Sequence, residues 1–191
     1  MITLPTVLFW PLDINHEVTN EAVEIRLWGK EKSGATSLVI AGLNPYFYLL
    51  PKKMENAQDV LKEVEGLQSR YIEIAKTEIV DKKYFGRPVK AIRVNCRTSE
   101  AMDKCSKLLG RLPSIKEHLE DDIRPATRYI IDNSVSPSGW YEFEVLRISR
   151  PDLMVDNVYE AIKQPKAVER LENPKIRVLG LSILCFSEKG S

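Results

Sequence analysis

Basic side chains gather in one stretch of this sequence, between residues 82 and 97, where they could hold phosphate groups. The cations of this stretch are Lys82, Lys83, Arg87, Lys90, Arg93 and Arg97. Tyr84 lies among them, and Tyr46 and Tyr48 lie on a strand expected nearby. A nucleic-acid single strand needs cations for its phosphates and aromatic faces for its bases. The stretch therefore favours a nucleic-acid surface, but a solvated face balanced by the acidic residues 117–122 explains it nearly as well.

Residues that could do other chemistry are few and poorly spaced. Cys96, Cys105 and Cys185 contain no Cys-x-x-Cys pair, and His16 and His118 lie far from them and from each other. This spacing does not suit a metal site. We also find no glycine-rich phosphate loop, no Ser/His/Asp set and no recognised carboxylate constellation. We therefore expect this chain to be noncatalytic, with no cofactor and no metal of its own.

Composition is that of an ordinary globular protein. The 191 residues are 43% hydrophobic and 29% charged, which suits one domain, or one domain with part of a second. The formal net charge of +1 provides no overall field, so any binding to nucleic acid must be local. The first residues lack a basic segment, and Pro5 and Pro11 interrupt their short apolar stretch, which excludes a signal peptide or a membrane span. We expect a cytoplasmic protein with no membrane partner.

Strand and helix patterns alternate between residues 44 and 123. We expect strands over 44–53, 71–80, 89–96 and 114–123, and helices over 55–70 and 99–112. The first helix has an apolar stripe of Ala57, Val60, Leu61, Val64 and Leu67. The second has Ala101, Cys105, Leu108 and Leu112 on one face, with Ser99 as its cap and Gly110 near its end. The order strand, helix, strand, strand, helix, strand predicts an α+β fold with a ferredoxin-like core.

Further elements flank this core. Residues 21–30 and 35–42 are expected to form a preceding β-hairpin. After a loop over 132–139, alternating side chains predict a strand over 140–148. A helix over 156–163 and a closing strand over 172–184 should follow, with a domain boundary near residue 131.

Three segments are more specific than this pattern requires. They are "NPYFYLLPK" (44–52), "KKYFGRPVKAIRV" (82–94) and "DDIRPATRYIIDNSVSP" (121–137). In order and spacing they resemble the N-terminal domain of archaeal and eukaryotic family-B DNA polymerases, most of all the archaeal type, which are nucleotidyltransferases of DNA replication or repair. The resemblance implies an N-terminal domain over residues 1–130. Residues 131–191 would then be a linker and the first strands of a truncated, RNase H-like exonuclease domain.

The resemblance also implies a binding site. In the family this domain lies along single-stranded template DNA, and many archaeal members capture template uracil in a pocket. The matching positions here are Pro45, Ala91, Ile123, Arg124, Pro125, Arg128 and Tyr129. Ala91 replaces the usual valine, Arg124 and Pro125 replace a Pro-Phe pair, and only His16 lies near the place of an expected tyrosine. Strand initiation also explains Pro45, a core position explains Tyr129, and an ion pair explains Arg128.

A second implication concerns the exonuclease motif. The family's Asp-Ile-Glu triplet, whose carboxylates hold two metal ions, corresponds to Ser182, Ile183 and Leu184 here. Neither Ser nor Leu supplies an anionic ligand, so an inactivated proofreading motif is expected. The palm, fingers and thumb have no counterpart, so we expect no polymerase activity from this chain alone. Mg²⁺ would belong to the full polymerase, whose remaining domains, with template DNA and other replication proteins, are the expected partners.

Two alternatives remain open. The chain could be a noncatalytic structural module that docks on the polymerase and exonuclease domains. It could also be an RNA-binding protein of the RNA-recognition-motif type, which shares the core topology. Residues 89–96, "VKAIRVNC", lack the aromatic pattern with which that motif stacks bases, which weighs against the second alternative.

Overall fold

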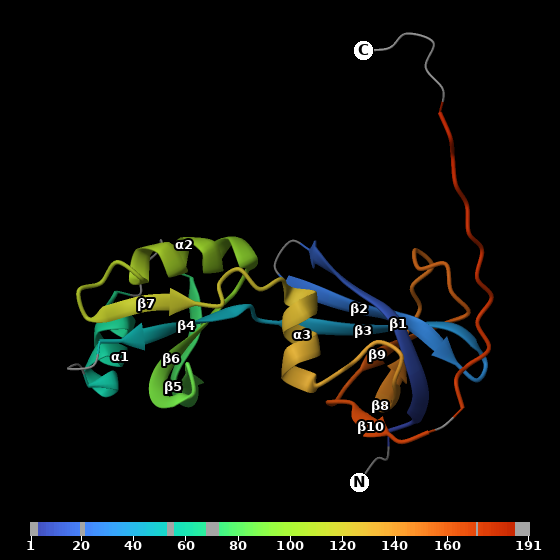
Figure 1. The fold of residues 1–191 in the computed structure, drawn as a ribbon, viewed down its shortest axis with the longest axis horizontal. Coiled ribbons are helices and arrows are strands. Elements are labelled where there is room, and N and C mark those ends of the chain that lie inside the picture. The colour runs from blue at the N-terminus through green and yellow to red at the C-terminus, as the bar shows by residue number, and fades with distance from the viewer. Residues whose placement is uncertain (1–3, 20–21, 53–55, 68–72, 171, 186–191) are drawn as a thin grey trace.

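The chain folds into two lobes, each built around a β-sheet. The computed structural model describes residues 4–19, 22–52, 56–67, 73–170 and 172–185. A four-stranded sheet with two helices forms one lobe, and a six-stranded sheet forms the other (Figure 1). Helix α3 (Pro125–Asn133) lies between them. None of the helices described here is long and apolar enough to cross a membrane.

The four-stranded lobe confirms the predicted ferredoxin-like core. Its elements are β4 (Tyr46–Pro51), α1 (Ala57–Gly66), β5 (Ile74–Tyr84), β6 (Arg87–Cys96), α2 (Ser99–Leu109) and β7 (Ile115–Leu119). The strands are antiparallel in the order β5-β6-β4-β7, which the split βαβ arrangement requires. One face of the sheet packs against both helices through Phe47, Leu49, Ile92 and Val94. The other face carries Tyr46, Tyr48, Ala91 and Arg93, because side chains alternate along each strand.

Both helices begin at a side-chain cap, although one cap differs from the prediction. Asn56 caps α1 by accepting a hydrogen bond from the Gln58 amide. Thr98, rather than Ser99, caps α2, because its hydroxyl accepts from the Ala101 amide at 3.1 Å. Helix α2 buries Leu109 and leaves Leu108 half exposed, so its apolar face is shifted by one residue from the predicted stripe. Residues 68–70 of the first expected helix and 71–72 of the next expected strand lie outside the described residues.

The six-stranded lobe is a sheet in the order β1-β2-β3-β9-β8-β10 that closes on itself. Its strands are β1 (Thr6–Thr19), β2 (Ala22–Glu31), β3 (Gly34–Leu43), β8 (Trp140–Arg147), β9 (Asn157–Ala161) and β10 (Lys166–Val168). The start of β1 pairs with β8, and the rest pairs with β2. The register shifts just after Pro11, which is where a strand tolerates proline. The hairpin of β2 and β3 confirms the prediction of a β-hairpin over 21–30 and 35–42, except that residue 21 lies outside the described residues.

Two expectations for the second half of the chain are wrong. Residues 157–161 form β9, which pairs in parallel with β3, instead of the expected helix over 156–163. Val158 is buried there against Val39 and Leu153, so tertiary packing overrides the local preference. The boundary suggested near residue 131 also does not separate two units, because β8, β9 and β10 complete the sheet that β1, β2 and β3 begin.

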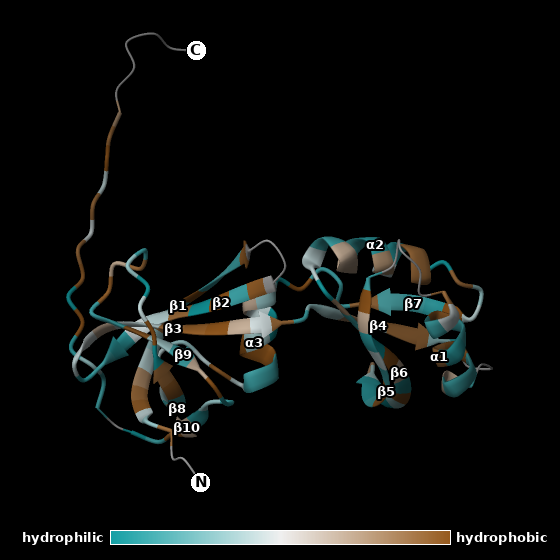
Figure 2. Ribbon diagram, turned by 180° about the vertical axis from the view of Figure 1, so that it is seen from behind, coloured by the Kyte–Doolittle hydropathy of each residue, from teal (hydrophilic) through white to brown (hydrophobic). Residues whose placement is uncertain are grey.

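The closing strand expected over 172–184 is also absent. Residues 172–185 form an extended segment without strand pairing (Figure 1). Its start contacts the lobe, because the carbonyls of Glu172 and Lys175 accept from Trp140 and Lys30, and the rest runs away from it. Much of the segment is hydrophobic (Figure 2), and Leu181, Ile183 and Leu184 are 86%, 89% and 97% exposed. A strand is stable only when its backbone groups find a neighbouring strand, and the described residues provide none for this segment.

An ion-pair network ties two parts of the six-stranded lobe together. Arg26, on β2, is 6% exposed and donates to Glu17 and Glu24, each at 2.6 Å. Arg150, in the loop after β8, donates to Glu24 at 2.9 Å and to Asp152 at 2.8 Å. The shared carboxylate of Glu24 therefore links the two guanidinium groups.

Acid should destabilise the protein through this network. The hydrogen bond from Arg150 lowers the pKa of Asp152 to about 2. Burial acts to raise the pKa of Glu24, but bonds from Arg150 and Arg26 outweigh it and lower that pKa. Carboxyl groups with lowered pKa values stabilise the fold above their unfolded pKa, and this contribution is lost as the pH falls through the folded value. The urea concentration at the midpoint of unfolding should therefore decrease as the pH is lowered from about 5 to about 2.

The Arg150→Gln variant should flatten this part of the pH profile, because the pKa of Asp152 then returns towards its ordinary value. Arg87→Gln is the control, because Arg87 is exposed and has no ion pair within the described residues. Its urea midpoint should depend on pH as steeply as that of the wild type. If the urea midpoint of Arg150→Gln depended on pH as steeply as that of the wild type, this network would not be the cause of the loss of stability in acid.

Candidate nucleic-acid interface

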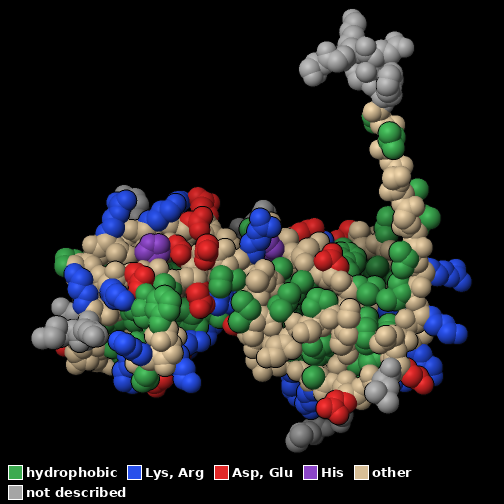
Figure 3. Space-filling model, in the orientation of Figure 1, with side chains coloured by type: hydrophobic (Ala, Val, Ile, Leu, Met, Phe, Trp, Pro, Cys, Tyr) green, Lys and Arg blue, Asp and Glu red, His purple; other side chains and the backbone are tan. Residues whose placement is uncertain are grey.

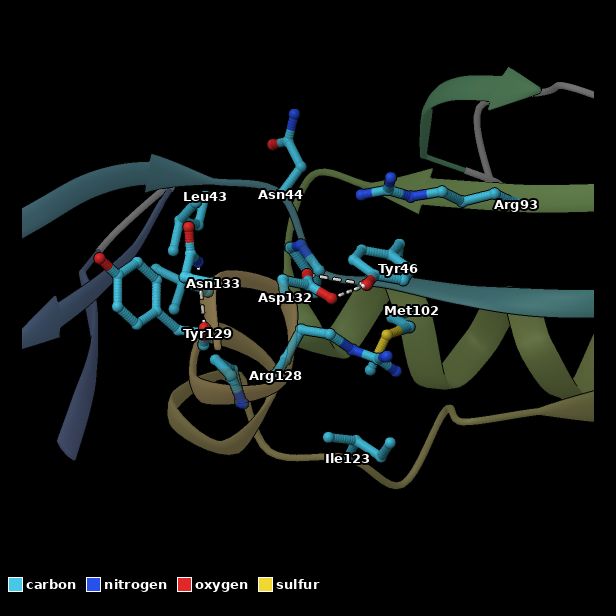
Figure 4. A pocket seen from close by; sticks show the side chains of 13 residues that line it. Leu43, Asn44, Tyr46, Arg93, Met102, Ile123, Arg128, Tyr129, Asp132 and Asn133 are labelled. Atoms are coloured by element: carbon cyan, nitrogen blue, oxygen red, sulfur yellow. Dashed lines mark hydrogen bonds between the residues drawn. The ribbon is translucent and has the colours of Figure 1, made fainter. Parts of the chain in front are cut away.

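A small cavity lies where the two lobes and α3 meet. Its volume is about 90 Å³. Leu43 lines it from the six-stranded lobe, Tyr46 and Arg93 from the four-stranded lobe, and Arg128 from α3 (Figure 4). Val23 of the six-stranded lobe also belongs to the lining. Sites for drug-sized ligands occupy roughly 300–1,000 Å³, so this cavity suits one small polar ring or part of it.

Tyr46 lies at the centre of this cavity wall, between two arginines (Figure 4). The guanidinium carbons of Arg93 and Arg128 lie 3.7 Å and 4.3 Å from the centre of its ring. Its hydroxyl donates to Asp132, whose two oxygens lie 2.6 Å and 2.8 Å away. Burial, reinforced by this bond, raises the pKa of Tyr46, so the phenol stays protonated and remains a donor. Two stacked guanidinium groups, a neutral phenol and the Asp132 carboxylate therefore form this part of the wall.

The two arginines are held to different degrees. Arg128 donates to the Glu120 carboxylate at 2.5 Å and to the Glu120 carbonyl at 3.1 Å. Glu120 has a φ of 65°, a left-handed conformation that few non-glycine residues adopt, so Arg128 holds an unusual backbone turn. Arg93 has one longer contact, 3.6 Å to Glu78, and its Nε is buried without a hydrogen-bond partner. Arg93 therefore keeps donor capacity for a ligand.

Most of the positions implied by the polymerase resemblance surround this cavity. Pro45, Ile123, Pro125, Arg128 and Tyr129 all line it. The simpler explanations of three residues hold as well: Arg128 forms an ion pair, Tyr129 is 5% exposed in a hydrophobic core, and Pro45 immediately precedes β4. Burial raises the pKa of Tyr129, which keeps that phenol neutral. Structural roles therefore account for these three residues, which also line the cavity.

Three implied positions lie elsewhere. Ala91 is buried beside Tyr48 and lines a second hollow of about 70 Å³ with Lys82 and Lys83. Arg124 is exposed before the first turn of α3, outside the cavity lining. His16 lies on β1 opposite Ile25 and does not line the cavity either.

Sequence reasoning missed several residues of the cavity, above all Asp132. Residue 132 was expected to begin a loop, yet it belongs to the last turn of α3 and accepts from Tyr46. Its signal was present, because an acidic residue follows Arg128, Tyr129 and an apolar pair in the quoted motif. Val23 and Met102 also line the cavity, and no sequence pattern placed these distant residues together.

The basic stretch forms the hairpin of β5 and β6 and one end of β6. Lys and Arg side chains surround the free end of this hairpin (Figure 3). Lys90 is paired with Asp81 at 3.0 Å, and the Lys82 ammonium lies 4.9 Å from the centre of the Tyr48 ring. Within the described ranges, Lys83 and Arg87 have no ion pair, and both are exposed. Arg97, just beyond β6, is exposed as well.

The aromatic part of the predicted surface is largely covered, which corrects the expectation of three stacking faces. Tyr46 and Tyr48 are each 5% exposed. Tyr84 is half-buried and donates to Glu117. Of the acidic residues 117–122, Glu120 binds Arg128, Asp121 lies 3.1 Å from His118, and Glu117 accepts a hydrogen bond from Tyr84 of the hairpin. Because Lys83 and Arg87 still have no ion pair within the described residues, the alternative of a fully balanced face does not describe the tip.

No metal centre is evident in the part of the chain that the structure describes, because no three His, Cys, Asp or Glu side chains cluster there. Cys96 and Cys105 are buried free thiols, and Cys185 is exposed.

Known proteins similar to this chain are archaeal DNA polymerases. It is 30% identical to DNA polymerase 2 of Aeropyrum pernix over 93% of its own length and 22% of that protein. It is 28% identical to DNA polymerase 3 of Saccharolobus solfataricus over 96% of its length and 23% of that protein. The family B DNA polymerase of Pyrobaculum calidifontis superimposes with a TM-score of 0.72 at 27% identity, over 87% of this chain and 21% of that one.

The chain thus spans about a fifth of the length of the curated relatives it matches. A comparison with protein-family models finds no match.

Tyr46→Phe should destabilise the protein by about 1–3 kcal/mol, because it removes a hydrogen bond to a charged carboxylate. Tyr48→Phe is the matched control: it lies on the same strand, is equally buried, and its hydroxyl has no hydrogen bond within the described residues. Urea unfolding of both variants would check the difference. A loss for Tyr48→Phe as large as that for Tyr46→Phe would argue against a special role of the Asp132 bond.

Proposed function

Because this chain is homologous to archaeal family-B DNA polymerases over most of its length, we propose that it is an N-terminal part of such a polymerase and binds single-stranded template DNA. One observation carries the proposal: five residues that match the family's template-side motifs lie around one cavity, beside two stacked arginines. Cations there and on the β5–β6 hairpin supply the charge that a phosphate backbone requires.

The cavity favours a more specific role, the capture of uracil in the template. Its polar wall offers the Arg93 and Arg128 guanidinium groups and the Asp132 carboxylate, which suit the donors and acceptors of a pyrimidine edge. Its volume of about 90 Å³ leaves little room for an added methyl group. Exclusion of one methyl group is worth about 1–3 kcal/mol, enough to distinguish uracil from thymine. A base must leave the stack to enter such a pocket.

Binding of two single-stranded DNAs that differ by one uracil in place of thymine tests this role. Fluorescence anisotropy should show at least about tenfold tighter binding of the uracil strand. Both affinities should fall with salt as phosphate contacts are screened. Binding of neither strand would contradict template binding, and equal binding would contradict uracil capture alone.

A cavity-filling variant sharpens the test. Ile123→Trp places a large ring at the half-buried cavity wall without removing an arginine, and it should abolish the uracil preference. Ile131→Trp is the control, because Ile131 lies on α3 but is 54% exposed and does not line the cavity. Loss of preference in both variants would argue against the cavity as the site.

The chain would contribute nothing to metal-dependent proofreading. Ser182 and Leu184, which occupy the family's carboxylate positions, lie in the exposed segment 172–185. Hydrolysis with two metal ions needs anionic ligands at such positions. The Mg²⁺ of the full polymerase would therefore be held by other parts of that enzyme.

A second candidate is a docking role toward other polymerase domains, and the exposed segment favours it. Side chains on both of its faces are apolar, including Val178 and Leu179 at 88% and 81% exposed. Apolar residues on both faces are typical of a strand buried inside a sheet. The segment would then become ordered against a partner domain rather than against either lobe.

Replacement of Leu181 and Ile183 by serine tests this role. The double variant should unfold within about 0.5 kcal/mol of the wild type, because both side chains are more than four-fifths exposed. It should also self-associate less in sedimentation experiments, since the exposed apolar run is interrupted. A clear loss of stability would mean that the segment packs on the chain itself.

A further inference from the structure

The turn at the tip of the β5–β6 hairpin contains a residue that the turn itself disfavours. Phe85 and Gly86 connect the strands, with φ values of 47° and 77°. A two-residue hairpin turn with both φ values positive favours Asn, Asp or Gly at its first position. Phe85 has none of the local bonding that lets Asn or Asp tolerate this conformation, so its presence costs stability.

Packing of the Phe85 side chain does not offset this loss of stability. The Phe85 side chain is 89% exposed, and its recorded ring contact is with Tyr84, at 4.6 Å between centroids. Among the residues that the structure describes, it is the only aromatic side chain classed as exposed. An exposed aromatic ring at a strained turn position is a local conflict of the kind that accompanies a binding role.

The surroundings of Phe85 are cationic. Lys83 and Arg87 flank the turn, are exposed, and have no ion pair within the described residues. Lys82 is exposed too, and its ammonium group lies near the ring of Tyr48. Figure 3 shows Lys and Arg side chains around this end of the lobe. Two anions of this region are already engaged: Asp81 is paired with Lys90, and Glu117 accepts a hydrogen bond from Tyr84.

We propose that Phe85 stacks on an unpaired base of single-stranded DNA while Lys83 and Arg87 hold the adjoining phosphates. Cations beside an exposed aromatic face are the combination by which proteins bind single strands without reading their sequence. Tyr46 and Tyr48 cannot serve as this face, because each is 5% exposed. The inference rests on the proposed template binding and adds its stacking residue.

The decisive variant is Phe85→Asn, because stability and binding should change in opposite directions. Asn suits the left-handed turn position, so the melting temperature should rise. Loss of one stacked base should weaken binding of single-stranded DNA by about 5- to 100-fold. The dependence of affinity on salt should stay unchanged, since no phosphate contact is lost.

Two matched controls separate stacking from other effects. Met154→Asn removes a side chain that is 97% exposed on the other lobe, and it should leave DNA binding unchanged. Lys83→Gln should lower the salt slope by roughly 0.7, the value for one phosphate contact on a single strand. Double-stranded DNA has no free base to offer, so Phe85→Asn should weaken its binding less than twofold.

The outcomes distinguish this inference from the function on which it rests. If the wild type binds no single-stranded DNA, both are overturned. If the wild type binds but Phe85→Asn binds equally well, the stacking role is overturned and template binding stands. An equal loss on single- and double-stranded DNA, or a changed salt slope, would also overturn stacking. Retained DNA affinity with loss of a protein contact would identify Phe85 as part of a protein interface instead.

Discussion

The arrangement of the two lobes depends on how the Tyr46 side chain is buried. Tyr46 belongs to the four-stranded sheet, but its hydroxyl donates to Asp132 of α3, and the preceding turn of α3 buries Tyr129 in the core of the six-stranded lobe. A single helix therefore contacts both lobes. Two arginines flank the phenol ring, and their like charges would repel without the carboxylates of Asp132, Glu120 and Glu78. These polar groups cannot collapse into a dry core, which leaves the cavity between the lobes.

In this arrangement, the groups that could give specificity for a base lie apart from the cations that could give affinity for phosphates. The cavity is small, and Tyr46 and Arg128 in its wall are already bonded to Asp132 and Glu120, so Arg93 is the main source of donors for a ligand. The unpaired cations instead lie at the hairpin tip, around Lys83 and Arg87. In nucleic-acid recognition, phosphate contacts position the strand and supply most of the affinity, while contacts with bases discriminate. In the proposed function, the cavity between the lobes and the hairpin tip of the four-stranded lobe would correspond to these two tasks.

Local pattern predicted the ferredoxin-like core well, because each of its elements has a regular apolar period and a clear boundary. Prediction from local pattern failed where pairing with a strand distant in the sequence decides the structure. Residues 157–161 have apolar spacing compatible with a short helix, yet β3 recruits them as a parallel strand. Residues 172–185 have a strand pattern but no neighbour within the described residues. Strand β1 contains Pro11, and pairing on either side of a bulge accommodates it. Several residues of the cavity were expected from the family resemblance and none from local pattern, because no periodicity places Val23 beside Arg128.

One departure from the family pattern has a physical explanation in this fold. Pro125 is the first residue of α3, where its missing N–H costs nothing and its fixed φ favours the helix. A proline restricts the residue before it to extended conformations, and Arg124 has φ −61° and ψ 144°. Its side chain is therefore directed to solvent, while Pro125 occupies the cavity wall. The exchanged pair therefore places a cyclic apolar side chain in the cavity wall and an exposed cation immediately before the helix.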